Sequence, residues 1–122
     1  MLRTLAFIYL CSLLMCGFAG KPQIRVANHG TAVLENVIVR FPAQEEKYGT
    51  IPAKGATAYR EIEQAYRYAY IEATVQGEKV VLQPIDYVGE QLLGGGKYTY
   101  ALTYNDKAET KYDRLRFELI RD

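Results

Sequence analysis

AYRYAYIEATV, residues 65–75, is the stretch that most clearly indicates the fold class of this chain. Side chains alternate along a β-strand between the two faces of a sheet, and the alternation here separates two kinds of residue. Tyr66, Tyr68 and Tyr70 share one face, whereas small and aliphatic residues occupy most of the other. We expect a strand over residues 67–76, with its aliphatic face buried in a core and the tyrosines turned outward.

Short alternating runs separated by turn residues continue on both sides of this stretch. Gly77 and Glu78 follow it directly and predict a hairpin. The run from Tyr98 to Tyr104 differs, because its aromatic face is the more apolar one, and we expect that face to be buried with its hydroxyls at the rim. Together the runs predict an all-β, antiparallel β-sandwich of about seven strands. The expected strands cover residues 23–27, 36–41, 56–62, 67–76, 79–82, 98–104 and 114–119, and residues 61–66 and 86–93 also fit a helical turn.

A second group of motifs lies earlier in the chain. The stretch Val26-Ala27-Asn28-His29-Gly30-Thr31-Ala32 is followed by Leu34 to Val39 and then by Ile51 to Thr57. This succession of V-x-N-x-G, N-V-x-V and a glycine-led stretch resembles the opening of bacterial immunoglobulin-like surface domains, and the cell-adhesion-related CARDB type is the nearest. The resemblance covers residues 24–59 and lacks the acidic, Asn-rich ending typical of that family. It implies an immunoglobulin-like sandwich and transfers no functional residue.

Residues 1–19 have the pattern of a secretory signal peptide. Arg3 precedes an apolar run that is shorter than the ~20 residues needed to span a bilayer. Gly17-Phe18-Ala19 fits the rule for a cleavage site, with small residues at the two positions that the peptidase reads. Cleavage there would leave a single domain, residues 20–122, outside the cytoplasm, in the periplasm or secreted.

A lipoprotein signal is the alternative reading of the same leader. Leu13 lies three residues before Cys16, as in such signals, whereas Met15 stands where a small residue is usual. Lipidation of Cys16 would anchor the protein to a membrane. Both cysteines lie in the leader, so a chain cleaved after Ala19 has no disulfide and depends on its core alone.

The composition excludes several classes of function. The chain has 15 Lys+Arg and 14 Asp+Glu, and losing Arg3 with the leader leaves 14 of each, so no broad field favours nucleic acid. Cleavage also removes Ser12, the single serine, so serine and cysteine nucleophiles are excluded. His29 is the single histidine and lies in a predicted turn, and we therefore expect no metal site and no cofactor.

Paired carboxylates are the one catalytic option that the composition leaves. Glu61 and Glu63 would share a strand face, and Asp86 lies in a predicted loop; glycosidases use two carboxylates at a set separation. A sandwich of this size seldom has the cleft that such enzymes need, and we expect no catalysis. The acidic turn from Asn105 to Asp113 lacks the oxygen spacing of an EF-hand loop, so we expect a solvated loop there.

The candidate binding residues are therefore the outward tyrosines and two arginines beside them. Tyrosine offers a large contact area and a polar tip at low entropic cost, which is why interfaces favour it. Arg60 and Arg67 would add polar contacts to the face formed by Tyr66, Tyr68 and Tyr70. Cross-strand packing of aromatic rings, without a ligand, is the other explanation of the same pattern.

These observations favour an exported, non-catalytic binding or structural module of a bacterial cell envelope. We expect it to contact an envelope protein or a glycan through the tyrosine-bearing sheet face, and to contact a membrane only through a lipid on Cys16. One alternative is a secreted inhibitor that acts through the loop of residues 86–90. The other is a small carboxylate-dependent hydrolase, in which Glu61, Glu63 or Asp86 would converge in a cleft.

Overall fold

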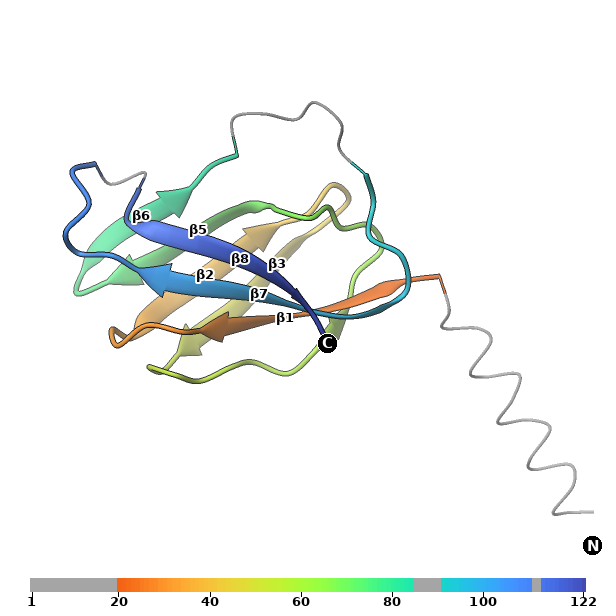
Figure 1. Ribbon diagram of the computed structural model, residues 1–122, viewed down its shortest axis with the longest axis horizontal. Helices are drawn as coiled ribbons and strands as arrows, with labels where there is room; N and C mark the ends of the chain where they lie inside the picture. Colours follow the sequence, from red (N-terminus) through yellow and green to blue (C-terminus); the bar gives the residue numbers. More distant parts are fainter. Residues whose placement is uncertain (1–19, 85–90, 111–112) are drawn as a thin grey trace, which may run out of the picture.

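The computed structural model describes residues 20–84, 91–110 and 113–122 as two four-stranded β-sheets packed face to face (Figure 1). The all-β prediction is confirmed, and the described residues form eight strands in place of the predicted seven or so. The strands are β1 Pro22–Asn28, β2 Leu34–Arg40, β3 Glu45–Ile51, β4 Arg60–Glu61, β5 Tyr70–Val75, β6 Glu78–Leu82, β7 Gly96–Tyr104 and β8 Leu115–Arg121.

The first sheet has the strand order β4-β1-β7-β8. β1 pairs with β7 in parallel, from Pro22 opposite Gly96 to Asn28 opposite Leu102, whereas its other neighbour β4 and the pair β7–β8 are antiparallel. The prediction of a wholly antiparallel sandwich is therefore wrong at this pair. Because the chain passes through the other sheet between β1 and β7, no turn sets their relative direction, and a parallel pair becomes possible.

The second sheet has the order β3-β2-β5-β6, with every pair antiparallel. β5 and β6 form the predicted hairpin, but its two-residue loop is Gln76-Gly77, one residue earlier than the predicted Gly77-Glu78. Gln76 and Gly77 have φ of 52° and 80°, as a type I′ turn requires. β3 was not expected from the sequence. Its charged residues and Gly49 conceal the alternation, and such residues are common on a strand that pairs on one side only.

Two predicted strands are shorter than expected. β4 is confined to Arg60–Glu61 rather than residues 56–62, and β5 begins at Tyr70 rather than at residue 67. The chain bends between the two strands, and Ile62, Ala65 and Ala69 are buried at spacings of three and four residues. Burial of these side chains breaks the period of two that suggested a continuous strand.

The core lies between the sheets and contains both faces that the alternation predicted to be buried. Ile71, Ala73 and Val75 of β5 are at most 2% exposed. Tyr98 and Tyr100 of β7 are 4% and 0% exposed, and the ring of Tyr100 packs edge-on against Phe117 with centroids 4.9 Å apart. The Tyr98 hydroxyl donates to the Gly94 carbonyl at 3.1 Å, a bond to backbone just upstream that a tyrosine corner also makes.

Several predictions concern residues outside the described parts of the chain. The leader, residues 1–19, lies there with Cys16, and so does the segment 85–90, which contains Asp86 and the predicted inhibitor loop. Within the parts that the structure describes, no helix is long and apolar enough to cross a membrane.

Candidate functional site

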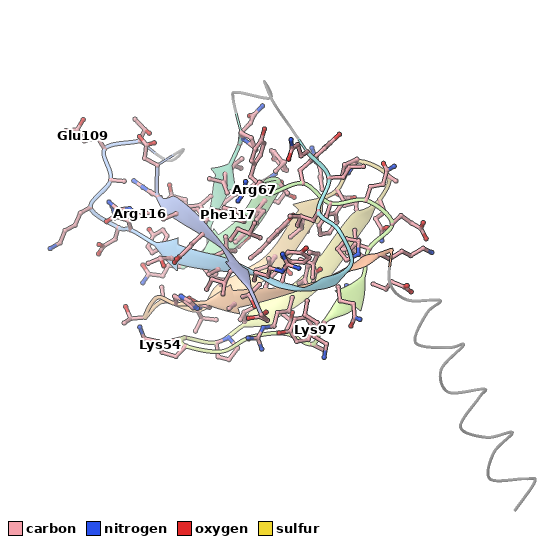
Figure 2. The ribbon with its side chains drawn as sticks, turned by 45° about the vertical axis from the view of Figure 1, so that its right-hand side comes forward. Lys54, Arg67, Lys97, Glu109, Arg116 and Phe117 are labelled. Carbon is pink, nitrogen blue, oxygen red and sulfur yellow. The ribbon has the colours of Figure 1, made fainter. Side chains whose placement is uncertain are left out.

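A hollow of about 260 Å³ lies where two connecting segments meet the ends of β7 and β8. Arg67 comes from the segment before β5, and its side chain can be located in Figure 2. Four consecutive residues come from the segment before β7, and the remainder come from the two strands. Among the described residues, the lining consists of Arg67, Gln91, Leu92, Leu93, Gly94, Tyr98, Leu119 and Arg121.

Backbone hydrogen bonds hold the two segments together beside this hollow. The Leu93 amide donates to the Ala65 carbonyl at 2.8 Å, and Tyr66 and Leu92 form an isolated antiparallel bridge. The carbonyl of Tyr66 also accepts a hydrogen bond from the buried hydroxyl of Tyr100. Arg67 therefore follows directly after a residue that is tied both to the opposite segment and to the core.

The described residues of this lining combine cationic and apolar groups, and none of them is acidic. The Arg121 guanidinium lies 5.8 Å from the centre of the Tyr98 ring, which positions it by a cation–π contact. Neither Arg67 nor Arg121 forms an ion pair with any residue that the structure describes. Leu92 is 50% exposed, a large value for a leucine that also lines a hollow. A carboxylate with an apolar neighbour would match these groups.

Of the predicted tyrosines, only Tyr70 lies in a strand. Its hydroxyl donates to a Glu72 carboxylate oxygen at 3.0 Å, and the Arg40 guanidinium covers its ring at 4.4 Å from the centroid. Lys79 forms an ion pair with the same carboxylate at 3.1 Å. Partial burial opposes ionisation of Glu72, but the hydrogen bonds from Lys79 and Tyr70 outweigh it and lower the pKa of Glu72. Tyr70 is thus part of a cluster on the outer face of the second sheet.

Tyr66 and Tyr68 precede β5 in the bent segment and are half-buried. The three tyrosines therefore do not share one face of a strand, and the prediction that they form a continuous stripe is wrong. Tyr66 and Tyr68 remain next to Arg67 in the chain, so they flank the one predicted binding residue that lines the hollow.

Arg60, the other predicted arginine, is engaged elsewhere. It forms an ion pair with Glu46 at 3.0 Å and lies over the ring of Tyr48 at 4.5 Å from the centroid. The Tyr48 hydroxyl donates in turn to the Ile24 carbonyl at 3.0 Å, and burial raises the pKa of Tyr48. This arrangement links the edge strand β3 to β1 and β4.

Arginine and lysine side chains lie over tyrosine rings at several places in the protein. Besides the contacts on Tyr48, Tyr70 and Tyr98, Arg25 and Lys97 both lie near the ring of Tyr59, at 4.9 and 5.1 Å from its centroid. A ring face that is covered by the protein's own cation is not open for stacking against a sugar. These contacts therefore reduce the aromatic surface that a glycan could use.

The structure describes two of the three carboxylates that were considered for catalysis. Glu61 and Glu63 are exposed, and Glu63 forms an ion pair with Lys21 at 3.0 Å. Asp86 lies outside the described residues. His29 is exposed, and its amide donates to the Leu102 carbonyl at 2.8 Å. Across residues 20–84, 91–110 and 113–122, no group of three or more His, Cys, Asp or Glu side chains could hold a metal ion.

Arg121, Leu92 and Leu119 line the hollow and were not predicted as binding residues. One signal for Arg121 was present in the sequence. Odd positions of β8 are apolar as far as Leu119, and Arg121 places a cation in the same register. No comparable signal marks Leu92, because its neighbours in space depend on the path of the chain between β6 and β7.

Comparison with known proteins extends to the fold alone. No protein-family model matches the chain, and no curated protein does. Among solved structures, the chain is similar to the NMR structure of a protein from Eubacterium rectale. The two are 14% identical, the likeness covers 84% of this chain and 88% of that chain, and the TM-score is 0.54.

Proposed function

We propose that this protein is an exported, non-catalytic binding module of a bacterial cell envelope, and that the hollow at Arg67 and Arg121 binds an acidic segment of a partner protein. The observation that carries this proposal is the pair of arginines without ion pairs among the described residues, beside an exposed leucine and with no acid among the described residues of the lining. Guanidinium groups bind carboxylates through charge-assisted, often bidentate hydrogen bonds.

The proposal keeps part of the predicted tyrosine surface. Tyr66 and Tyr68 are the chain neighbours of Arg67 and stay candidate contacts, although neither is in the described lining of the hollow. Tyr70 and Arg60 are left out because Glu72, Arg40, Glu46 and Tyr48 engage them. A protein partner is preferred to a glycan because cations of this chain lie over the rings of Tyr59 and Tyr70, and because Tyr48 and Tyr98 are buried. Export through the leader and an immunoglobulin-like relationship to CARDB-type domains are parts of the same proposal.

A fluorescent peptide of alternating Glu and Leu, with a Lys-Leu peptide as its counterpart, tests the hollow directly. Binding is measured by anisotropy for the wild type, for Arg67→Gln/Arg121→Gln and for Lys47→Gln/Lys107→Gln. The last variant removes the same net charge from exposed lysines outside the hollow. We expect only the arginine variant to lose affinity for the acidic peptide, by about tenfold or more, since two charge-assisted contacts disappear.

Equal losses in the two double variants would reduce the effect to net charge and contradict the proposal. So would equal binding of the Glu-Leu and Lys-Leu peptides. Cross-linking in envelope fractions, with Arg67→Gln/Arg121→Gln and Tyr66→Ala/Tyr68→Ala beside the wild type, then identifies the partner. A partner that both variants capture as well as the wild type does would place the binding surface elsewhere.

A further inference from the structure

The free edge of β8 is the longest regular strand edge that the described sheets leave unpaired. The four edge strands are β4, β8, β3 and β6. β4 has two residues, β6 has five, and the pairing of β3 with β2 shifts register twice. β8 pairs with β7 over seven residues without a shift, and no described strand is hydrogen-bonded to its other edge, although β6 of the second sheet lies near it.

The hydrogen bonds of β8 determine which backbone groups point to the free side. The Asn105 amide donates to the Arg114 carbonyl, and the Asp122 amide donates to the Lys97 carbonyl. In an antiparallel pair the bonded residues alternate, so the even-numbered residues of β8 bond to β7. The amides and carbonyls of Leu115, Phe117, Leu119 and Arg121 therefore point away from β7.

Apart from Arg121 at the end of the strand, the charges of β8 lie on even-numbered residues, on the outer face of the first sheet. Arg116 and Glu118 are both exposed, and Arg116 and Phe117 can be followed along β8 in Figure 2. Neither Arg116 nor Glu118 forms an ion pair with a described residue. Both ends of the free edge border hollows, one lined by Leu119 and Arg121 and another of about 560 Å³ lined by Leu115 and Arg116. The second hollow is also lined by Leu82 of β6, so a further strand would have to fit beside that strand.

We propose that β8 pairs antiparallel with β8 of a second copy of this chain, in the register centred on Phe117. This register places Leu115 opposite the second copy's Leu119 in bonded pairs, and it places Arg116 opposite the second copy's Glu118 twice. The pairs of Arg116 with Glu118 are non-bonded ones, in which cross-strand side chains are closest.

Charge selects this register among those that the backbone permits. Bonded pairs across the new interface require odd-numbered residues opposite odd-numbered ones, so the neighbouring registers are centred on Arg116 or on Glu118. Those two registers place Arg116 opposite Arg116 or Glu118 opposite Glu118, and like charges directly opposite destabilise a sheet. Only the register centred on Phe117 pairs each charge with its opposite.

Sedimentation of the purified protein at concentrations up to about 1 mM tests the pairing, because a single strand edge gives a small and weak interface. The variants are Arg116→Glu, Glu118→Arg and the double swap. We expect a dimer in the wild type, association weaker by about tenfold or more in each single variant, and recovery in the double swap. Circular dichroism verifies that each variant is folded, and none of the substitutions alters the lining of the hollow at Arg67 and Arg121.

Amide hydrogen exchange supplies the second measurement. In the dimer, the amides of Phe117 and Leu119 should become protected as the concentration rises, whereas those of Arg116 and Glu118 are protected by β7 at all concentrations. A protein that stays monomeric at about 1 mM would overturn the proposal. A dimer whose affinity does not change with the charge reversals would also overturn it, and so would a dimer in which the Phe117 amide is not protected. In either case the contact would lie on another surface. Protection that arises only when the Glu-Leu peptide is added would assign the edge to a ligand strand instead.

Discussion

At the scale of single residues, Asn28 supports more of the fold than its place in a predicted turn suggested. It is fully buried at the end of β1, and its side-chain amide donates to the carbonyls of Ala32 at 2.7 Å and Ile51 at 3.1 Å. Its Oδ1 accepts from the Gly30 amide at 3.0 Å. One side chain thus connects β1, the following turn and the end of β3.

Asn28→Ala leaves three backbone groups without their partner, two of them carbonyls and one an amide. We expect a loss of about 2–4 kcal/mol in the free energy of unfolding, because unsatisfied buried groups keep their desolvation cost. Urea denaturation measures it. Asn105→Ala is the matched control, since Asn105 accepts one exposed bond from the Lys107 amide. A similar loss in the two variants would contradict the role given to Asn28.

At the scale of elements, the β5–β6 hairpin has a turn whose first residue is unfavourable for its conformation. Gln76 has φ of 52°, and a type I′ turn prefers Asn followed by Gly. Gln76→Asn is therefore expected to stabilise the protein by about 0.5 kcal/mol. Gly77→Ala should cost about 1 kcal/mol through backbone strain alone, because a Cβ there meets no atom within 4 Å. Thermal denaturation of both variants checks the two signs, and a destabilised Gln76→Asn would contradict the turn type.

The charge cluster around Glu72, on the outer face of the second sheet, should make the stability of the protein depend on pH. The pKa of Glu72 in the folded protein lies below its ordinary value of 4.5. A lowered folded-state pKa adds stability above the unfolded value, and that stability is lost as the pH falls through the folded value. Glu72→Gln should thus be less stable than the wild type at pH 7, by less than about 1 kcal/mol, and the difference should shrink as the pH falls below the ordinary pKa and vanish below the folded-state pKa. Urea denaturation across this range measures it; a difference that persists in acid would exclude the carboxylate as its cause.

The predicted alternation was correct where one sheet face is buried and wrong where the chain crosses between sheets. β1, β2, β5, β6, β7 and β8 all overlap strands expected from the sequence. β3 was missed because an edge strand rich in charge has no clear apolar face. The strand expected over residues 67–76 was too long at its start because Ala65 and Ala69 enter the core from a bent segment.

At the scale of the whole molecule, the predicted leader, residues 1–19, precedes all the described strands in sequence. β1 begins at Pro22, so cleavage after Ala19 leaves every described strand intact. Expression of the full chain in a bacterial host should yield a mature protein that begins at Gly20, because the leader has a cationic start, a short apolar run and a small-x-small site. Intact-mass spectrometry checks the start, and Cys16→Ala should not change it. A protein that begins at a lipid-modified Cys16, and that Cys16→Ala releases from the membrane, would establish the lipoprotein alternative.

The sequence by itself determined the all-β class, the buried faces of β5 and β7 and the existence of a hairpin between β5 and β6. These follow from period and turn chemistry, which act between residues close together in the chain. Only the tertiary structure decided that β1 and β7 run parallel, that cations cover tyrosine rings, and that Arg67 and Arg121 line one hollow. Those arrangements join residues far apart in sequence, and burial of the core between the two sheets, rather than any local preference, brings them together.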